Sequence, residues 1–395
     1  MIRTTIRTNT RTTIRTSFKT SHLLLTAVVA ISMSALLPAL SYAQTSSSAG
    51  GAVFVMTNAA DHNKIVAYKR GTDGSLKEGR SYWTEGRGSG GVTDPLASQG
   101  SLTLSQDRPL LFAVNAGSGD ISVFRVNGAG LQLLEKVPCG GSEPVAVAQH
   151  GSLVYVVNAG GASSVVGFRL GSDGSMKPIP GSLAYLSTGN SGASSASFSP
   201  DGQFLLVTEK VTNSIDAFHV QTNGTLGPIK VNASAGPGAF SVLFAPGGAA
   251  LVAETGPAGG TDASAISSYA VGPNGVLTAI SASVPTLGAA TCWTAITPDG
   301  RFVYTSNAGT STISGFAVGA NWTLTAISGT IEGINPAGST NLDVAISSDS
   351  KFLYSLNSGT GTISIFAINS DGTLSSLGDV DGLSAAAGVN GIAAM

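Results

Sequence analysis

The sequence has 395 residues, of which 42% are apolar and only 11% are charged, and its formal net charge is −2. Average soluble domains carry about 25% charged residues, and surface helices are usually rich in Glu and Lys, so this composition argues against a helix-rich fold. The 52 glycines are instead typical of many short strands joined by turns.

Residues 1–43 are predicted to be a secretory signal peptide. Basic residues recur from Arg3 to Lys19 without an acidic residue, and an apolar run follows from Leu23 to Leu40. Ser41 and Ala43 then place small residues at the two positions that a signal peptidase reads, which predicts cleavage before Gln44. Two alternatives remain open: an uncleaved anchor, because 18 apolar residues nearly span a bilayer, and a mitochondrial presequence.

The part of the chain after the signal peptide is acidic. The leader holds five of the 20 basic residues and none of the 22 acidic ones, which leaves a net charge of −7. Nucleic acids and anionic lipids bind clustered Lys and Arg, so neither is expected as a partner. We expect a periplasmic or secreted protein without a membrane span once the signal is removed.

Residues 44–50 are predicted to be a polar linker, and residues 51–395 contain seven repeats. Each repeat has a second strand that ends in Asn or Glu, and we call these seven residues the strand-end positions. They are spaced by 43 to 57 residues. The strand-end positions are Asn58, Asn115, Asn158, Glu209, Glu254, Asn307 and Asn357.

The repeats predict an all-β fold, a seven-bladed β-propeller with four antiparallel strands per blade. Residues 299–324 and 349–374 are identical at 13 of 26 positions, and both contain a turn, a Val/Tyr/Phe-rich strand, a second turn and another strand. A self-similar unit of short strands is typical of a propeller blade. Turns such as Pro200-Asp201-Gly202 separate the first strand from the second.

The two ends of the repeat region predict how the ring closes. The first repeat begins directly with a second strand, and residues 391–395 follow the seventh repeat with the small apolar character of a first strand. We therefore expect the C-terminal strand to complete blade one and to remove an open edge. Cys139 and Cys292 fall in non-neighbouring repeats, too far apart for a disulfide, and are expected to be thiols.

The Tyr155-Val156-Val157-Asn158 strand, the Pro-Asp-Gly turns and the seven repeats together resemble the lactonase-type seven-bladed propellers. That family includes the bacterial 6-phosphogluconolactonases and the fungal 3-carboxymuconate cyclases. The resemblance covers residues 51–395. It implies a site at the mouth of the central channel, where family members carry His and Arg at the starts of the innermost strands.

This sequence departs from the family at those positions. The positions that match the family's His and Arg hold Ser194 in the fourth repeat and Phe240 and Ser241 in the fifth. In the third repeat, Glu143-Pro144-Val145 stands where a His could have been. Ser and Phe supply neither a base nor a fixed positive charge. Three histidines follow the leader: His62 and His150 are predicted in turns and His219 within a third strand, all as surface or packing residues.

Four carboxylates and one aromatic residue remain as candidates for a site. The catalytic candidates are Glu143, Glu209, Glu254 and Asp343, and the candidate for a ligand pocket is Trp293. Glu209 and Glu254 have a structural alternative, because they stand where other repeats have Asn and can cap turns. Asp343 has one too, as a carboxylate bonded to a turn or to water instead of facing the channel. Trp293 has one also, because it can fill the channel instead of lining a pocket.

Two functions are therefore expected from the sequence. The first is hydrolysis of a neutral or weakly polar cyclic ester, with Glu254 or Asp343 as the base. The second is non-catalytic, an exported propeller on the cell surface or in the periplasm that binds a protein, a glycan or a small molecule, or serves as a scaffold. No cofactor or metal is expected, because the Asp379–Gly382 stretch lacks the further ligands of a calcium loop. We expect a monomer.

Overall fold

The computed structural model describes residues 13, 17, 50–257 and 260–395. The predicted signal peptide and residues 44–49 of the linker lie outside these residues, apart from two isolated positions, so their assignment stays a prediction. All the strands belong to the compact unit of Ser47–Met395. Among its described residues no helix is long and apolar enough to cross a membrane.

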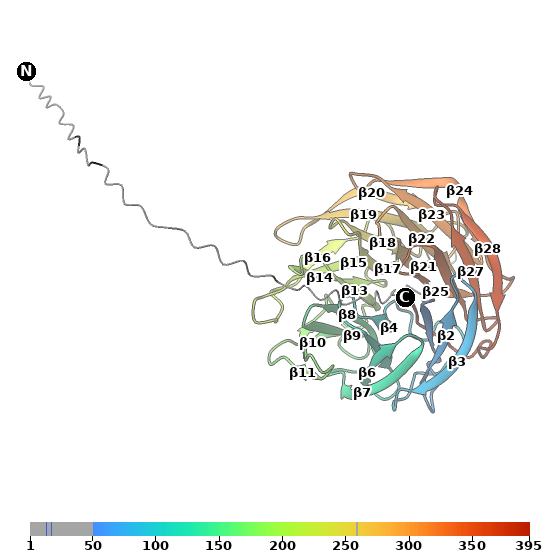
Figure 1. Ribbon diagram of the computed structural model, residues 1–395. Coiled ribbons are helices and arrows are strands. Elements are labelled where there is room, and N and C mark those ends of the chain that lie inside the picture. Colours follow the sequence, from blue (N-terminus) through green and yellow to red (C-terminus); the bar gives the residue numbers. More distant parts are fainter. Residues whose placement is uncertain (1–12, 14–16, 18–49, 258–259) are drawn as a thin grey trace, which may run out of the picture. The chain divides into compact units, whose positions relative to one another are not determined.

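The structure confirms a seven-bladed, all-β propeller (Figure 1). Each blade is an antiparallel sheet, written below from its innermost strand outwards. Blade one is β29(Ile392–Ala394)-β1(Ala52–Met56)-β2(Lys64–Arg70)-β3(Leu76–Trp83), blade two is β4(Leu102–Leu104)-β5(Leu110–Asn115)-β6(Asp120–Asn127)-β7(Gly130–Pro138), and blade three is β8(Pro144–His150)-β9(Leu153–Asn158)-β10(Ser164–Leu170)-β11(Met176–Pro178) with β12(Ala184–Tyr185). Blade four is β13(Ala193–Phe198)-β14(Phe204–Glu209)-β15(Ser214–His219)-β16(Lys230–Ala233), and blade five is β17(Ala239–Phe244)-β18(Ala250–Glu254)-β19(Ala265–Val271)-β20(Leu277–Pro285). Blade six is β21(Thr291–Ile296)-β22(Phe302–Asn307)-β23(Thr312–Val318)-β24(Leu324–Ile334), and blade seven is β25(Asn341–Ile346)-β26(Phe352–Asn357)-β27(Thr362–Ile368)-β28(Leu374–Val380).

The outer edge of blade three differs from the four-strand pattern. Its last strand is divided into β11 and β12, which both pair with β10. Pro178 ends the first piece and Pro180 follows it, and proline removes a donor from the strand ladder. The interruption lies at the rim and leaves the inner three strands of the blade intact.

The apolar core lies between blades rather than within one sheet. Clusters of buried side chains join neighbouring blades all round the ring. The second strands are therefore covered on both faces, and all of them except β9 are buried at every residue. This explains why their sequences are apolar or small throughout instead of alternating with polar residues.

A tyrosine in the second strand links three blades to the next blade. Its hydroxyl donates a hydrogen bond to the glycine carbonyl of the polar turn that opens the neighbouring outer strand. The pairs are Tyr155 with Gly224 at 2.5 Å, Tyr304 with Gly372 at 2.7 Å and Tyr354 with Gly74 at 3.0 Å. A Cβ on Gly74 would overlap the Phe352 ring, so this turn needs glycine for the close approach as well as for its positive φ.

The C-terminal strand closes the ring, as the sequence predicts. Strand β29 pairs antiparallel with β1, with Phe54 opposite Ala393. The innermost strands then contact one another in a complete cycle, β29-β4-β8-β13-β17-β21-β25 and back to β29, and the C-terminus lies near the centre of the ring in Figure 1. The prediction for the cysteines is also confirmed, since Cys139 and Cys292 are buried and free.

Candidate functional site

A long connection closes one mouth of the central channel. It leads from β3 to β4, and we call residues 94–101 the axial segment. The Ser98 hydroxyl donates to the Val145 carbonyl of blade three at 2.9 Å, and the Ser98 carbonyl accepts the Trp293 indole N–H of blade six at 2.8 Å. The Gln99 backbone N–H donates to Ser194 of blade four at 2.9 Å. The segment therefore spans the axis at the end where the innermost strands begin.

The side-chain amide of Gln99 forms two hydrogen bonds with the backbone of Thr294 on β21, as a neighbouring strand would. Its amide nitrogen donates to the Thr294 carbonyl at 2.7 Å, and its oxygen accepts the Thr294 N–H at 3.1 Å. Because a buried peptide group that loses its partner costs about 1–3 kcal/mol, Gln99→Ala is expected to lower the free energy of unfolding by that amount in chemical denaturation. Gln106→Ala, at an exposed turn, is the control; an equal effect of both changes would contradict this role.

Large buried side chains fill the space beneath the axial segment. Phe240 and Trp293 pack edge to face with ring centroids 5.1 Å apart, and Trp293 has no exposed surface. The Lys210 amine lies 5.5 Å from the centre of the Phe240 ring. Ser194, also buried, donates to the Phe240 carbonyl at 2.8 Å. The positions that carry His and Arg in the lactonase-type family are thus part of a packed layer.

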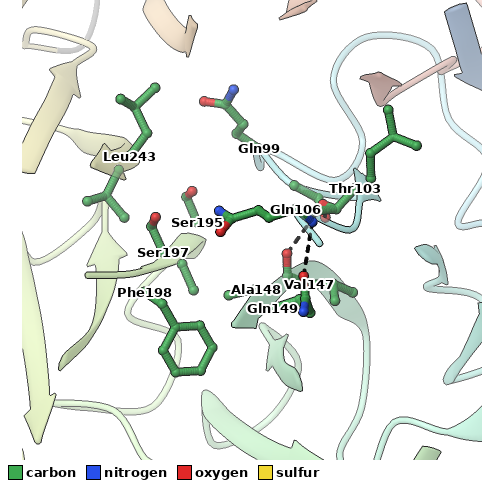
Figure 2. Close-up of a pocket in the computed structure, with 14 residues that line it drawn as sticks. Gln99, Thr103, Gln106, Val147, Ala148, Gln149, Ser195, Ser197, Phe198 and Leu243 are labelled. Atoms are coloured by element: carbon green, nitrogen blue, oxygen red, sulfur yellow. Dashed lines mark hydrogen bonds between the residues drawn. The ribbon is translucent and has the colours of Figure 1, made fainter. Parts of the chain in front are cut away.

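On the other side of Gln99 the channel is hollow. Two cavities, of about 150 and 290 Å³, share the wall around Gln99 and Thr103, and together we call them the axial channel. They reach the turns at the far ends of the innermost strands, where Gln106 is exposed. Figure 2 shows Gln99 above the cavity, with Ser195 and Ser197 at its wall.

The axial channel is polar but almost uncharged. Its side chains are mainly amides, hydroxyls and aliphatic groups, and the innermost strands pair on one side only, which leaves their other backbone edge facing the axis. Among the residues that the structure describes, Asp343 is the only charged one that lines either cavity. A channel of this kind suits a neutral ligand with hydroxyl or carbonyl groups.

Asp343 lies in the channel wall on β25. One carboxylate oxygen accepts the Val344 N–H at 2.9 Å and lies 3.4 Å from the Gln99 amide nitrogen; the other accepts the Ile392 N–H at 3.1 Å. Burial raises the pKa of Asp343 to about 7, although the two N–H groups oppose the shift, and the charge of Asp94 adds to it. A carboxyl with this pKa can both take and give a proton near neutral pH.

Asp94 begins the axial segment on the side away from the channel. Its carboxylate accepts the Ala97 N–H at 3.0 Å and the Asn390 amide at 3.1 Å. Burial raises the pKa of Asp94 to about 6, with Lys210 opposing the shift. This aspartate therefore holds the turn of the axial segment against the C-terminal part of the chain.

Glu254 lies at its strand-end position in blade five and is completely buried. One oxygen accepts hydrogen bonds from the Gly236 N–H and from the hydroxyls of Ser234, Ser267 and Tyr269, at 2.8 to 3.3 Å; the other accepts from Ser283 at 2.7 Å. A cavity of about 170 Å³ lies beside it, away from the axial channel. Through these five hydrogen bonds the carboxylate connects β18 to β19, to β20 and to the loop between β16 and β17.

Glu209, in blade four, is paired with another acid. It accepts the Ser187 N–H at 2.9 Å and the Thr212 hydroxyl at 2.7 Å, and it lies beside the fully buried Asp216 on β15. Burial, together with the charge and hydrogen bonding of Glu209, raises the pKa of Asp216 to about 8. At neutral pH the Asp216 carboxyl therefore keeps its proton.

The structure does not bring the predicted carboxylates together. Glu143 is exposed in the turn before β8 with a positive φ of 53°, Glu209 and Glu254 are buried in different blades, and of the four only Asp343 lines the channel. Sequence reasoning missed Gln99 and Asp216. The repeat contained a signal for Asp216. In blades two, six and seven, the residue seven positions after the strand-end Asn is a Ser, whose hydroxyl accepts a hydrogen bond from that Asn at 2.7 to 2.9 Å. Asp216 stands at the same distance after Glu209.

Comparison with known proteins rests on structure. No family model matches the sequence, and no curated protein matches it. A candidate 6-phosphogluconolactonase from Bacteroides uniformis is 21% identical, with a TM-score of 0.68 over 87% of this chain and 99% of that chain. The periplasmic gluconolactonase of Pseudomonas aeruginosa is 19% identical, with a TM-score of 0.66 over 86% and 99%. This chain has the lactonase-type propeller fold.

The same architecture also supports other chemistry. The virginiamycin B lyase of Staphylococcus aureus is 13% identical to this chain, with a TM-score of 0.53 over 75% of this chain and 88% of that chain. A hydrolase and a lyase can thus be built on one scaffold, and the residues of the site must decide the reaction.

Proposed function

We propose that this protein is an exported hydrolase that opens a neutral cyclic ester in the axial channel, with Asp343 as the general base. The observation that carries the proposal is the position of the Asp343 carboxyl in the channel wall, 3.4 Å from the Gln99 amide, with its pKa raised to about 7. Similarity to a gluconolactonase fold supports the reaction class. Export rests on the signal peptide predicted from the sequence.

The chemistry needs one water molecule. The ionised Asp343 takes a proton from the water as its oxygen attacks the carbonyl carbon of the ester, and charge develops on the carbonyl oxygen. Backbone N–H groups on the free edges of the innermost strands are the donors available to stabilise that charge. The ring C–O bond then breaks, and the leaving oxygen takes the proton from Asp343, which yields the open hydroxy acid.

The residues of the channel favour a neutral substrate. Sugar phosphates are bound in proteins by Arg or Lys, and among the described residues neither type lines the cavities. The axial segment occupies one mouth, so the substrate reaches Asp343 from the opposite face, past the turn that contains Gln106. A neutral sugar lactone or a small aliphatic lactone meets these conditions.

The test is hydrolysis of a panel of neutral lactones of different ring size by residues 44–395. We expect Asp343→Asn to lower kcat by about 100-fold or more, because Asn cannot accept the proton. Activity of the unmodified protein should rise with pH around pH 7, where Asp343 ionises. Glu143→Gln, at an exposed position that lines neither cavity, is the matched control and should retain full activity.

Asp343 also accepts a hydrogen bond from the C-terminal strand, so its variant needs a stability measurement. Asp343→Asn must remain folded at the assay temperature, as judged by its melting curve, for the loss of kcat to count. Turnover that persists in a folded Asp343→Asn protein would contradict the assignment of the base. It would direct attention to Glu254 and its separate cavity.

A second candidate function is ligand binding without catalysis. It is favoured by one observation, the separation of the predicted carboxylates, which do not gather at a channel mouth with an arginine. In that case the axial channel binds its neutral ligand and releases it unchanged. Absence of turnover on every lactone, together with saturable binding of one of them, would establish this function instead.

A further inference from the structure

A second cavity with chemistry of its own lies at the rim of blade one. It has a volume of about 380 Å³, larger than either cavity of the axial channel. Its walls come from the turn between β1 and β2 and from the first residues after β3, and include Asp61, His62, Trp83, Glu85 and Arg87. This cavity, which we call the rim pocket, contains no residue of the axial channel.

Trp83 is the central surface of the rim pocket. Its side chain is 58% exposed, and an exposed indole contributes little to a core. The equivalent residue at the end of the outer strand is aromatic in blade three, where it is Tyr185. In four other blades it is not aromatic: the residues are Pro138, Ala233, Pro285 and Ile334.

Neighbouring side chains hold the indole in place. The His62 ring lies 4.9 Å from it between centroids, at an interplanar angle of 41°, and the Lys64 amine lies 5.8 Å from its centre. Asp61 accepts the His62 backbone N–H at 2.8 Å, and its carboxylate lies 3.3 Å from the His62 Nδ1 atom. A fixed aromatic surface loses little conformational freedom when a ligand stacks on it.

The polar side chains around Trp83 include both negatively and positively charged groups. Asp61 and Glu85 offer carboxylate acceptors and Arg87 offers guanidinium donors, and all three side chains are exposed. Within the described part of the chain, the Glu85 and Arg87 side chains form no hydrogen bond or ion pair, so they are free to bind a ligand. The mixed charge disfavours a strongly anionic or cationic ligand and matches one that donates and accepts many hydrogen bonds.

We propose that the rim pocket binds a neutral pyranose sugar, with one face of the ring stacked on Trp83 and its hydroxyls bonded to Asp61, Glu85 and Arg87. The C–H groups of a pyranose form an apolar face that fits an indole, while its hydroxyls pair with charged side chains. The volume is in the range of small-ligand sites. The site is independent of hydrolysis in the axial channel.

Isothermal titration calorimetry of residues 44–395 with cellotetraose, maltotetraose and tetra-N-acetylchitotetraose tests the proposal. At least one of them should bind with a Kd of about 1 mM or tighter. Trp83→Ala should weaken that binding by at least about tenfold, and Glu85→Gln by a smaller factor. Tetragalacturonate, an anionic counter-probe, should bind more weakly than the best neutral sugar.

Tyr185→Ala provides the matched control, because Tyr185 stands at the equivalent position of blade three and is 60% exposed. It should leave sugar binding unchanged, and both variants should keep the wild-type melting temperature. No saturable binding of any of the three neutral sugars, equal loss in Trp83→Ala and Tyr185→Ala, or tighter binding of tetragalacturonate would overturn the proposal. Lactone turnover should be the same in Trp83→Ala as in the unmodified protein, which separates the two sites.

Discussion

Removal of residues 391–395 is expected to lower the melting temperature by roughly 10 °C. The truncation takes away the innermost strand of blade one and leaves β1 with an unpaired edge towards the axis. It also removes the buried Ile392 side chain and the hydrogen bonds that join Met395 to Ala52 and Ile392 to Asp343. Burial of one Ile contributes about 1.5–3 kcal/mol, and the strand hydrogen bonds add about 1 kcal/mol each.

The measurement is thermal unfolding followed by circular dichroism, with two comparisons. Ile392→Ala should produce a smaller decrease than the truncation, because the backbone pairing of β29 with β1 survives. Leu377→Ala on the outer strand of blade seven removes an apolar side chain that is 49% exposed and should have little effect. An unchanged melting temperature after truncation would mean that the ring is held closed without its last strand.

Between about pH 4 and pH 8 the stability of the protein should fall as pH rises, and Asp216 should account for part of the decrease. Its pKa is raised to about 8 in the folded protein, from 3.8. Between these two values the folded state holds a proton that the unfolded state has released. The stabilisation is therefore complete below about pH 4 and is lost progressively up to about pH 8, at no more than about 1.4 kcal/mol per pH unit.

Asp216→Asn should remove this contribution, because Asn is neutral at every pH and can still donate to Glu209. Relative to the unmodified protein, the variant is expected to gain stability steadily from pH 5 to pH 8 in urea unfolding experiments. Asp343 and Asp94, whose pKa values are also raised, give a decrease of the same sign that remains in both proteins. The difference between the two curves isolates Asp216.

Two further variants sharpen this experiment. Asp381→Asn, at an exposed position, should follow the pH dependence of the unmodified protein. The double variant Glu209→Asn/Asp216→Ser recreates the Asn–Ser hydrogen bond of blades two, six and seven, and should be as insensitive to this titration as Asp216→Asn. Parallel curves for Asp216→Asn and the unmodified protein would contradict a proton held by Asp216 in the folded state.

The sequence was sufficient for the architecture because the information for a blade is local. Each strand and turn of the repeat appears in consecutive residues, and seven copies of one pattern leave few alternatives. The missing first strand at Gly51 and the extra strand at residues 391–395 were enough to predict closure. Even the tyrosine and asparagine of the repeated strand have contacts that recur from blade to blade, such as Asn307 with Ser314 at 2.8 Å.

The axial segment could not be predicted in the same way. Its sequence has no repeat, and its contacts join residues far apart in the chain: Ser98 bonds to Val145, 47 positions away, and to Trp293, 195 positions away. Which residues of a connection reach the axis depends on the radius of the closed ring. Only the tertiary structure therefore decided that Gln99 separates a filled mouth from an open channel.

The same reason explains the outcome for the candidate residues. The sequence by itself determined the lactonase-type propeller fold and the absence of His and Arg at the positions expected from the resemblance, and it identified a short set of carboxylates. Burial and neighbours then distinguished them, because these carboxylates have different surroundings: solvent at Glu143, five hydrogen-bond donors at Glu254, another acid at Glu209 and a hollow channel at Asp343. Those environments arise from packing between blades, which no single repeat encodes.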